Sequence, residues 1–218
     1  MSPSARMPDE LTRRAANLAA SGRAILGVTG CPGCGKSTLA ERLVARLDPE
    51  ERWVVRVPMD GFHLANAALD RLGRRQRKGA IDTFDAFGYL ALLRRIRTEQ
   101  DNPVYAPDFE RVLEQPIAAS IAIEPDVRLV ITEGNYILSP TRPWPEIREL
   151  IAEVWYVELD DTVRRDRLVA RHAAFGKSLP EARRWVTEVD EPNARQIAST
   201  RHLADLIVDM AVLEDDER

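Results

Sequence analysis

Residues 27–38 read GVTGCPGCGKST and contain two overlapping motifs. From Gly30 to Ser37 the spacing is G-x-x-x-x-G-K-S, which is typical of a loop that binds phosphate groups. Cys31 and Cys34 form C-x-x-C, a spacing found in redox sites and in zinc sites. Both motifs commonly lie between a strand and a helix, so the rest of the chain must decide between them.

The residues on each side predict a strand before this stretch and a helix after it. Ala24 to Thr29 form a short apolar run, which is typical of a buried parallel strand. From Lys36 to Leu47 apolar residues recur at helical spacing, and Pro49 follows the helix end. A strand–loop–helix order suits phosphate, because backbone N–H groups and the positive helix N-terminus can face its oxygens.

The phosphate loop explains the stretch better than the cysteine motif does. In such a loop the lysine reaches the β- and γ-phosphates, and the hydroxyl that follows holds Mg²⁺. A zinc site would need two further ligands, but the chain has no other cysteine and its three histidines are scattered. A dithiol at a helix N-terminus would have a lowered thiol pKa, so a redox role stays the less favoured alternative. We therefore expect a nucleotide with Mg²⁺, bound by Gly30, Cys31, Pro32, Gly33, Cys34, Gly35, Lys36, Ser37 and Thr38.

The composition is that of a globular protein and argues against some partners. The chain has 218 residues, of which 44% are hydrophobic and 30% charged, with a net charge of −4. A negative net charge argues against general affinity for nucleic acid or anionic membranes. No apolar run is long enough for a signal peptide or a membrane span, so we expect a cytoplasmic protein. Only Lys36, Lys78 and Lys177 are lysines, and all other basic residues are arginines.

The order of apolar segments predicts an α/β fold in one domain over residues 1–218, with a mainly parallel five-stranded sheet. Besides the first strand, buried strands are expected at 53–57, 129–132, 154–159 and 206–210. Besides the helix after the loop, helices are expected at 9–21, 84–97, 161–173 and 179–199, the first within an N-terminal segment 1–22. Residues 102–125 contain four prolines and are expected to form a hairpin or a lid over the sheet edge.

Two carboxylates are expected at the carboxyl ends of strands, where ligands bind in open parallel sheets. Asp60 follows the second strand and is placed to accept the proton of an attacking hydroxyl group. Glu133 follows the apolar run at 129–132 and suits the positioning of Mg²⁺ or water near the phosphates. No lysine has the N-K-x-D context of a guanine-specific GTPase, which argues against that class.

Three arginines share one face of the helix expected at 161–173. Arg164, Arg167 and Arg171 follow the spacing i, i+3, i+7. A row of guanidinium groups suits a phosphoryl group in transfer, because its negative charge must be neutralised in the transition state. The alternative is a solvated arginine face, which is common in an arginine-rich chain.

These motifs together resemble those of one kinase superfamily. The phosphate loop, Met59–Leu64, Ile81–Phe87 and Thr132–Tyr136 occur in the order seen in the uridine kinase, pantothenate kinase and phosphoribulokinase superfamily. The resemblance extends from about Ile25 to Val208 and is nearest to the nucleoside/nucleotide kinase-like or fructose-transport-associated branch. It implies a P-loop NTPase three-layer sandwich and ATP-dependent phosphorylation of a hydroxyl group on a small molecule.

The resemblance also implies roles for segments and residues. Residues 102–125 would form a substrate hairpin, and residues 161–178 a lid over the phosphates. The catalytic set would consist of Asp60 as the base with Lys36, Arg167 and Arg171. The metal would be bound by Ser37 and Glu133. The acceptor would be bound by Asp60, His63, Asp82, Tyr105, Arg111, Glu133 and Asn193.

The identity of the acceptor stays open. Thr83-Phe84 replaces His-Pro, and Gly88 replaces the final Asp, of the Asp-His-Pro-Asp-Ala-Phe-Asp motif of uridine kinases. A sugar, a nucleoside and a pantothenate-like compound are the alternatives, and the resemblance allows for a homodimer. The rival class is a nucleotide-binding regulatory protein with a vestigial kinase site, which the acids at positions 60, 82 and 133 disfavour.

Overall fold

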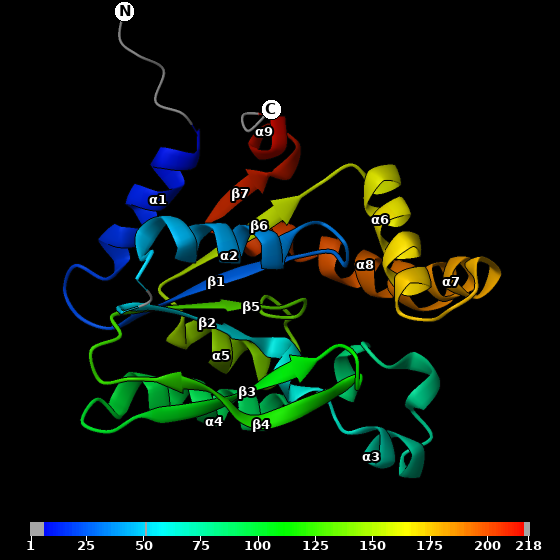
Figure 1. Cartoon of the computed structure of the whole chain (residues 1–218), viewed down its shortest axis with the longest axis horizontal. Helices are drawn as coiled ribbons and strands as arrows, with labels where there is room; N and C mark the ends of the chain where they lie inside the picture. The colour runs from blue at the N-terminus through cyan, green and yellow to red at the C-terminus, as the bar shows by residue number, and fades with distance from the viewer. Residues whose placement is uncertain (1–6, 51, 216–218) are drawn as a thin grey trace, which may run out of the picture.

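The centre of the protein is a five-stranded parallel sheet with the strand order β2-β5-β1-β6-β7 (Figure 1). The structure is a computed structural model that describes residues 7–50 and 52–215. The strands are β1 (Ala24–Gly30), β2 (Val54–Pro58), β5 (Leu129–Glu133), β6 (Glu153–Glu158) and β7 (Leu206–Asp209). Both β1 and β5 are buried along their whole length, because both faces of the sheet are covered. The predicted α/β class is confirmed.

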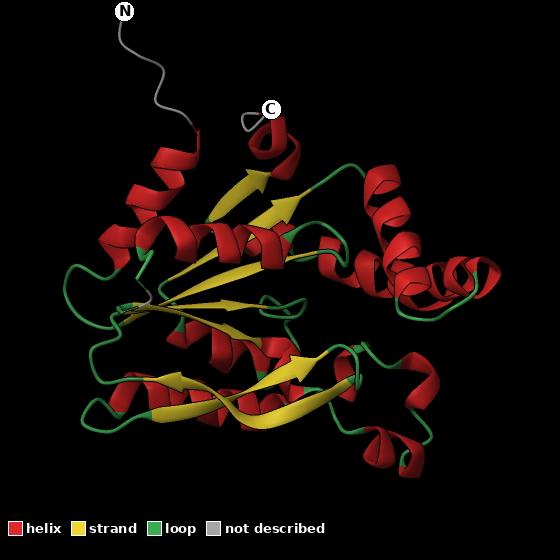
Figure 2. Cartoon of the chain, viewed as in Figure 1, coloured by secondary structure: helices red, strands yellow, loops and turns green. Residues whose placement is uncertain are grey.

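Helices lie on both faces of the sheet and give three layers (Figure 2). One outer layer consists of α1 (Met7–Leu18), α2 (Lys36–Leu47) and α9 (Met210–Asp215). The other contains α4 (Ala86–Thr98) and α5 (Trp144–Leu150). Leu39 and Leu43 of α2 pack in one core with Ile131, whereas Leu93 of α4 packs in the second core with Val130. Neighbouring residues of β5 thus face opposite layers, as the alternation of a strand requires.

Residues 102–125 contain a β-hairpin of β3 (Val104–Glu110) and β4 (Gln115–Ile123), which pair as a separate antiparallel sheet. Val104 and Ile123 are buried in the same core as α4. The sequence left a hairpin and a lid as alternatives, and the structure has the hairpin. Its turn reaches the carboxyl edge of the parallel sheet, where Arg111 lies beside the phosphate loop.

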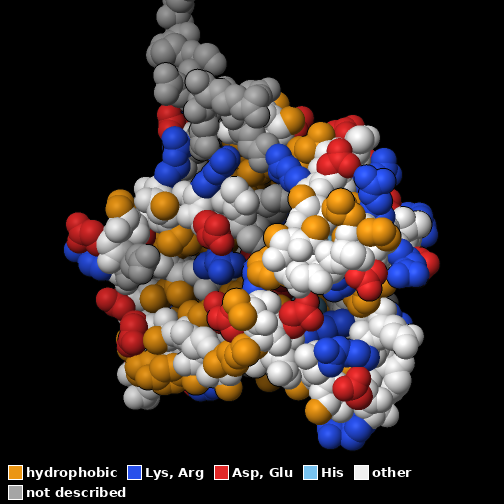
Figure 3. Space-filling model, turned by 45° about the vertical axis from the view of Figure 1, so that its right-hand side comes forward, with side chains coloured by type: hydrophobic (Ala, Val, Ile, Leu, Met, Phe, Trp, Pro, Cys, Tyr) orange, Lys and Arg blue, Asp and Glu red, His pale blue; other side chains and the backbone are white. Residues whose placement is uncertain are grey.

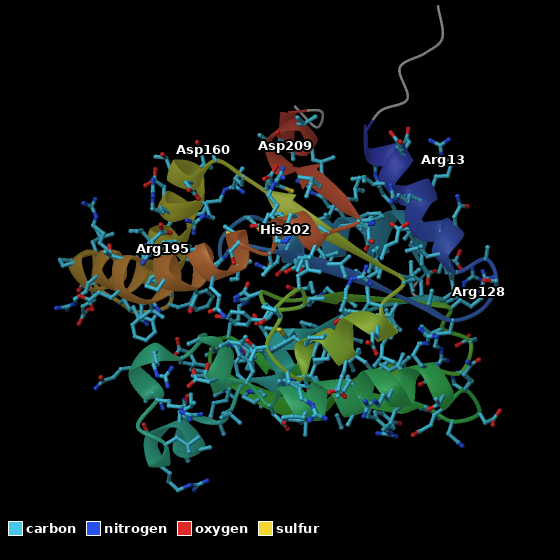
Figure 4. The ribbon with its side chains drawn as sticks, turned by 180° about the vertical axis from the view of Figure 1, so that it is seen from behind. Arg13, Arg128, Asp160, Arg195, His202 and Asp209 are labelled. Carbon is cyan, nitrogen blue, oxygen red and sulfur yellow. The ribbon has the colours of Figure 1, made fainter. Side chains whose placement is uncertain are left out.

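After β6 the chain forms three helical segments that we call the arm, at the right of Figure 1. They are α6 (Asp161–Ala174), α7 (Leu179–Trp185) and α8 (Glu191–Ala198). Asp160 caps α6, where its carboxylate accepts from the N–H groups of Thr162 and Val163 (Figure 4). Ser178 and Glu181 form a capping box at the start of α7.

The helix predicted at 179–199 is confirmed as one continuous helical run, in which a π-helical turn at Val186–Asp190 separates α7 from α8. Pro192 lacks an N–H group, and its ring crowds the carbonyl group of the preceding turn, so the hydrogen-bonding pattern changes just before it. The helix predicted at 9–21 is α1, and part of the N-terminal segment 1–22 lies outside the described residues.

A short helix, α3 (Asn66–Arg71), lies in residues 64–83, which we call the α3 projection (Figure 1). Single 3₁₀ turns occur at Met59–Phe62, Arg75–Arg77, Ile81–Thr83 and Arg201–Leu203. Within residues 7–50 and 52–215, no helix has both the length and the apolar character needed to cross a membrane.

Candidate active site

The phosphate loop joins β1 to α2, as predicted, and its backbone requires glycine. Gly30 has a φ of 147°, and a Cβ atom there would lie 2.5 Å from the carbonyl oxygen of Val157 in the neighbouring strand. Gly35 has a φ of 100°, in the left-handed region that favours glycine. Any other residue at Gly30 would push the loop away from the sheet.

The residues predicted to bind nucleotide do not all face the same space. A hollow above the loop is lined by Gly33, Gly35, Lys36, Ser37 and Thr38, together with Arg111, Arg167 and Arg171. The Nζ atom of Lys36 donates to the carbonyl oxygen of Cys31 at 3.1 Å, so the ammonium group lies back over the loop. Pro32 instead lines a second pocket, and Cys34 is buried beneath the loop. Arg167 and Arg171 of α6 therefore lie where anionic phosphates would enter.

Ser37 and Glu133 meet at the carboxyl edge of the sheet. The Ser37 hydroxyl donates to Oε1 of Glu133 at 3.1 Å, and Arg56 donates to the same oxygen at 3.0 Å. Burial, with the nearby Asp60 carboxylate, raises the pKa of the Glu133 carboxyl, whereas Lys36 and Arg56 oppose that shift. A hydroxyl and a carboxylate are oxygen donors of the kind that Mg²⁺ prefers, so the pair fits the predicted metal.

Asp60 lies between two hollows. It follows β2 in the 3₁₀ turn Met59–Phe62 and lines one hollow together with Arg56 and Glu133. It also lines a second pocket, which we call the acceptor pocket. The next residue, Gly61, must be glycine because the hairpin packs closely against it. A Cβ atom at Gly61 would lie 2.4 Å from the carbonyl oxygen of Pro107.

The acceptor pocket opens between the hairpin, the α3 projection and the arm. Among the predicted acceptor-binding residues, His63, Arg111 and Asn193 line it with Asp60. Nδ1 of His63 lies 2.8 Å from the Asp60 carbonyl oxygen, and its ring centre lies 4.9 Å from that of Phe109. Burial lowers the pKa of the His63 imidazole, so the neutral ring is favoured near neutral pH.

Three predicted acceptor-binding residues do not line this pocket. Glu133 lines the neighbouring hollow with Asp60, and Asp82 and Tyr105 line neither space. Asp82 forms two hydrogen bonds with Arg77, of 2.6 and 2.5 Å, which hold its carboxylate within the α3 projection. Tyr105 is 55% exposed because it alternates along β3 with Val104 and Ala106, whose side chains face the core. Neither side chain lines the acceptor pocket in this structure, and their role in acceptor binding stays a prediction.

Arg164 does not belong with the other two arginines. Its side chain is buried and donates to the Pro32 carbonyl oxygen at 3.2 Å, to Glu191 at 2.5 Å and to Asp161 at 3.0 Å. Through these hydrogen bonds the Arg164 guanidinium joins α6 to the phosphate loop and to α8. The prediction that Arg164 faces the phosphates is wrong.

The two cysteines are free thiols in different surroundings. Burial raises the pKa of the Cys34 thiol, so the lowered pKa predicted from the helix N-terminus is wrong for this residue. Sγ of Cys31 lies 3.3 Å from the Tyr156 hydroxyl and 3.4 Å from the Ala194 carbonyl oxygen. A buried thiol and a hydrogen-bonded one fit the packing of a tight loop.

Arg56 and the pair His172–Asp190 were not among the residues predicted from the sequence. Arg56 is the only charged residue in the apolar run 53–57, and that isolation was an available signal. Nε2 of His172 lies 2.8 Å from Asp190 on the arm side of the acceptor pocket. The only local signal for Asp190 was the interruption of the helical pattern before Pro192.

Comparisons with known proteins agree with this geometry. The model of the phosphoribulokinase / uridine kinase family matches residues 25–212. A uridine kinase candidate of Schizosaccharomyces pombe is 35% identical over 182 residues, which cover 79% of this chain and 77% of that protein. An uncharacterised protein of Escherichia coli is 30% identical over 190 residues, which cover 86% of this chain and 78% of that protein.

Among solved structures, a candidate fructose transport system kinase from Silicibacter sp. TM1040 superimposes with a TM-score of 0.84 at 31% identity. The match covers 94% of this chain and 100% of that one. The family model covers most of the chain, including the phosphate loop, Asp60 and Glu133. The chain therefore belongs to the phosphoribulokinase / uridine kinase family.

Proposed function

We propose that the protein is an ATP-dependent kinase that transfers the γ-phosphoryl group of MgATP to a hydroxyl group of a small molecule. The observation that carries the proposal is the position of Asp60. Its side chain borders both the hollow that contains Glu133 and the acceptor pocket that contains Asn193. A general base must lie within reach of both the acceptor hydroxyl and the Mg²⁺-bound phosphate, and Asp60 borders the acceptor pocket and the hollow of the proposed metal ligand Glu133.

The nucleotide side of the site uses the loop and its neighbours. The loop backbone and Lys36 bind the β- and γ-phosphates of ATP. Ser37 and Glu133 would hold Mg²⁺, which supplies charge neutralisation at the phosphate oxygens when it is bound. Arg56, at 3.0 Å from Glu133, fixes the orientation of that carboxylate and favours its ionised form.

The acceptor side uses Asp60 as a general base. Its carboxylate takes the proton of the acceptor hydroxyl while the hydroxyl oxygen forms a bond to the γ-phosphorus and the bond to ADP breaks. Arg167 and Arg171 neutralise the charge that develops on the phosphoryl oxygens. The products are a phosphate monoester and ADP.

The test is ADP release with a panel of sugars, nucleosides and hydroxy acids, compared with the rate without acceptor. A stimulated rate and a new monoester signal in the ³¹P NMR spectrum are the expected results. ATP binding without stimulation by any acceptor would favour the nucleotide-binding regulatory protein instead.

A further inference from the structure

The three lysines of this arginine-rich chain all line pockets of the candidate active site. Lys36 lines the hollow above the phosphate loop, and Lys78 and Lys177 line the acceptor pocket. Everywhere else the chain uses arginine for positive charge. A lysine differs from an arginine in presenting a compact ammonium group with three donors. The position of Lys78 and Lys177 therefore bears on what the acceptor pocket binds.

Lys78 is held in place on the hairpin side of the pocket. Its Nζ atom donates to Oδ1 of Asn66 at 2.8 Å and also to the carbonyl oxygen of Glu114. The same ammonium lies 5.1 Å from the centre of the Phe109 ring. Two of its three N–H donors are thus used by the protein, and one is left for a ligand.

Lys177 lies on the arm side of the same pocket. Its Nζ atom lies 4.8 Å from the centre of the Trp185 ring. Within the part of the chain that the structure describes, it forms no ion pair. Its electrostatic attraction to Glu181 acts without a hydrogen bond between the two side chains, so the ammonium donors stay available to a ligand.

The charges around the pocket are mainly positive. The cationic side chains are Arg75, Lys78, Arg111, Arg171 and Lys177. The carboxylates are Asp60, Glu114 and Asp190. Asp190 is already paired with His172, and Asp60 is the proposed base. Figure 3 shows Lys and Arg side chains gathered on the α3 projection below the arm. Arg75 is paired with Asp70 at 3.7 Å, and Arg111 and Arg171 also line the hollow above the phosphate loop. Lys78 and Lys177 are therefore the cations that remain for the acceptor itself.

Two of the aromatic rings that line the pocket carry an ammonium group. Phe109 lies on the hairpin side and Trp185 on the arm side, and each has a lysine ammonium on one face. The ligand thus meets Lys78 and Lys177 beside those rings. We infer that the acceptor carries a carboxylate or phosphate group besides its hydroxyl, and that Lys78 and Lys177 bind this anionic group. The inference rests on the proposed kinase function and names its substrate class.

Matched acceptor pairs test the substrate class. ADP release is measured with glycerate and glycerol, with pantothenate and pantothenol, and with fructose 6-phosphate and fructose, and uridine is added as a neutral nucleoside. We expect the kcat/KM of the anionic member of the productive pair to exceed that of its neutral partner by about tenfold or more. Whether the productive pair contains a carboxylate or a phosphate shows which anionic group the pocket binds. A neutral acceptor with the higher kcat/KM overturns the inference and leaves the kinase proposal standing.

Variants test the two lysines. Lys78→Gln and Lys177→Gln should each raise the KM for the anionic acceptor by about tenfold, with the KM for ATP unchanged. The matched control is Arg71→Gln, which removes the same charge from an exposed position of α3 that does not line the pocket. Equal effects in all three variants would mean that net charge alone is responsible, and the inference would be wrong.

A binding measurement keeps the inference testable if no acceptor in the panel is turned over. With the nucleotide site filled by the magnesium complex of AMP-PNP, inorganic phosphate serves as the probe of the acceptor pocket. Phosphate should raise the Tm of the parent protein and of Arg71→Gln, but not that of the Lys78→Gln, Lys177→Gln double variant. The inference is overturned if phosphate leaves the parent Tm unchanged or stabilises the double variant equally.

Discussion

Replacement of Arg164 by methionine should lower thermal stability and leave the rate of phosphoryl transfer nearly unchanged. Methionine keeps much of the apolar stem but removes every donor. The guanidinium is 2% exposed and has three acceptors, which are the Pro32 carbonyl, Glu191 and Asp161. The change therefore leaves one buried carbonyl and one partly buried carboxylate without their partner.

The size of the effect follows from the exposure of each acceptor. Asp161 is 69% exposed, so its ion pair contributes less than about 1 kcal/mol. Glu191 is 19% exposed, and the loss of a hydrogen bond to such a charged group costs about 1.5–3 kcal/mol. The Pro32 carbonyl adds about 1 kcal/mol. A total of about 3 kcal/mol corresponds to a fall in Tm of roughly 6–12 °C for a chain of this size.

The assay is thermal unfolding beside steady-state kinetics, with Arg165→Met as the matched control. Arg165 also faces Glu191, at 3.6 Å, but its side chain is 44% exposed, so its loss should cost less than about 0.5 kcal/mol. In Arg164→Met we expect a higher KM for ATP, because Pro32 belongs to the phosphate loop. An unchanged Tm with a kcat reduced about 100-fold would refute this reasoning and make Arg164 a phosphate-binding arginine.

Three further predictions concern the loop and the base. Lys36→Ala should abolish ATP turnover while the Tm falls little, since the proposed partner of this ammonium is the nucleotide; a near-parental kcat/KM would contradict that. Asp60→Asn should lower kcat by about 10²–10⁴-fold with little change in nucleotide affinity, as titration calorimetry can show; a collapse of affinity at constant kcat would place Asp60 in nucleotide binding. The double variant Cys31→Ala, Cys34→Ala should stay active, and iodoacetamide should modify Cys34 slowly in the folded protein because burial raises its thiol pKa; a folded but inactive double variant would revive the redox interpretation.

The sequence predicted what depends on short-range pattern. The five strands, α2 and the capping box at Ser178 follow from periodicity and from residue types at fixed spacing. The phosphate loop was found for the same reason. Element ends differ by one to three residues in most cases, because the last turn of a helix depends on its neighbours.

The sequence could not predict contacts between distant segments. Arg164 and Pro32 are 132 positions apart, and only the fold shows that the arginine faces the loop and not the phosphates. Tyr105 was assigned by motif, but the phase of β3 against the core decides which side it faces. Asp82 was assigned in the same way, but its hydrogen bonds with Arg77 hold its carboxylate in the α3 projection.

Arg56 shows how a local irregularity in an amino-acid sequence can indicate a site. A charged residue within an apolar strand loses hydration when both faces of the sheet are covered. This loss is costly unless an opposite charge offsets it, so an arginine there implies a nearby carboxylate. The partner here is Glu133, which ends the neighbouring strand and also accepts from Ser37. Glu133 is therefore held from two sides at the sheet edge, by the helix after the phosphate loop and by the strand that leads to Asp60. Through Arg56 and Glu133, the segment that carries the proposed base is joined to the segment that binds phosphate.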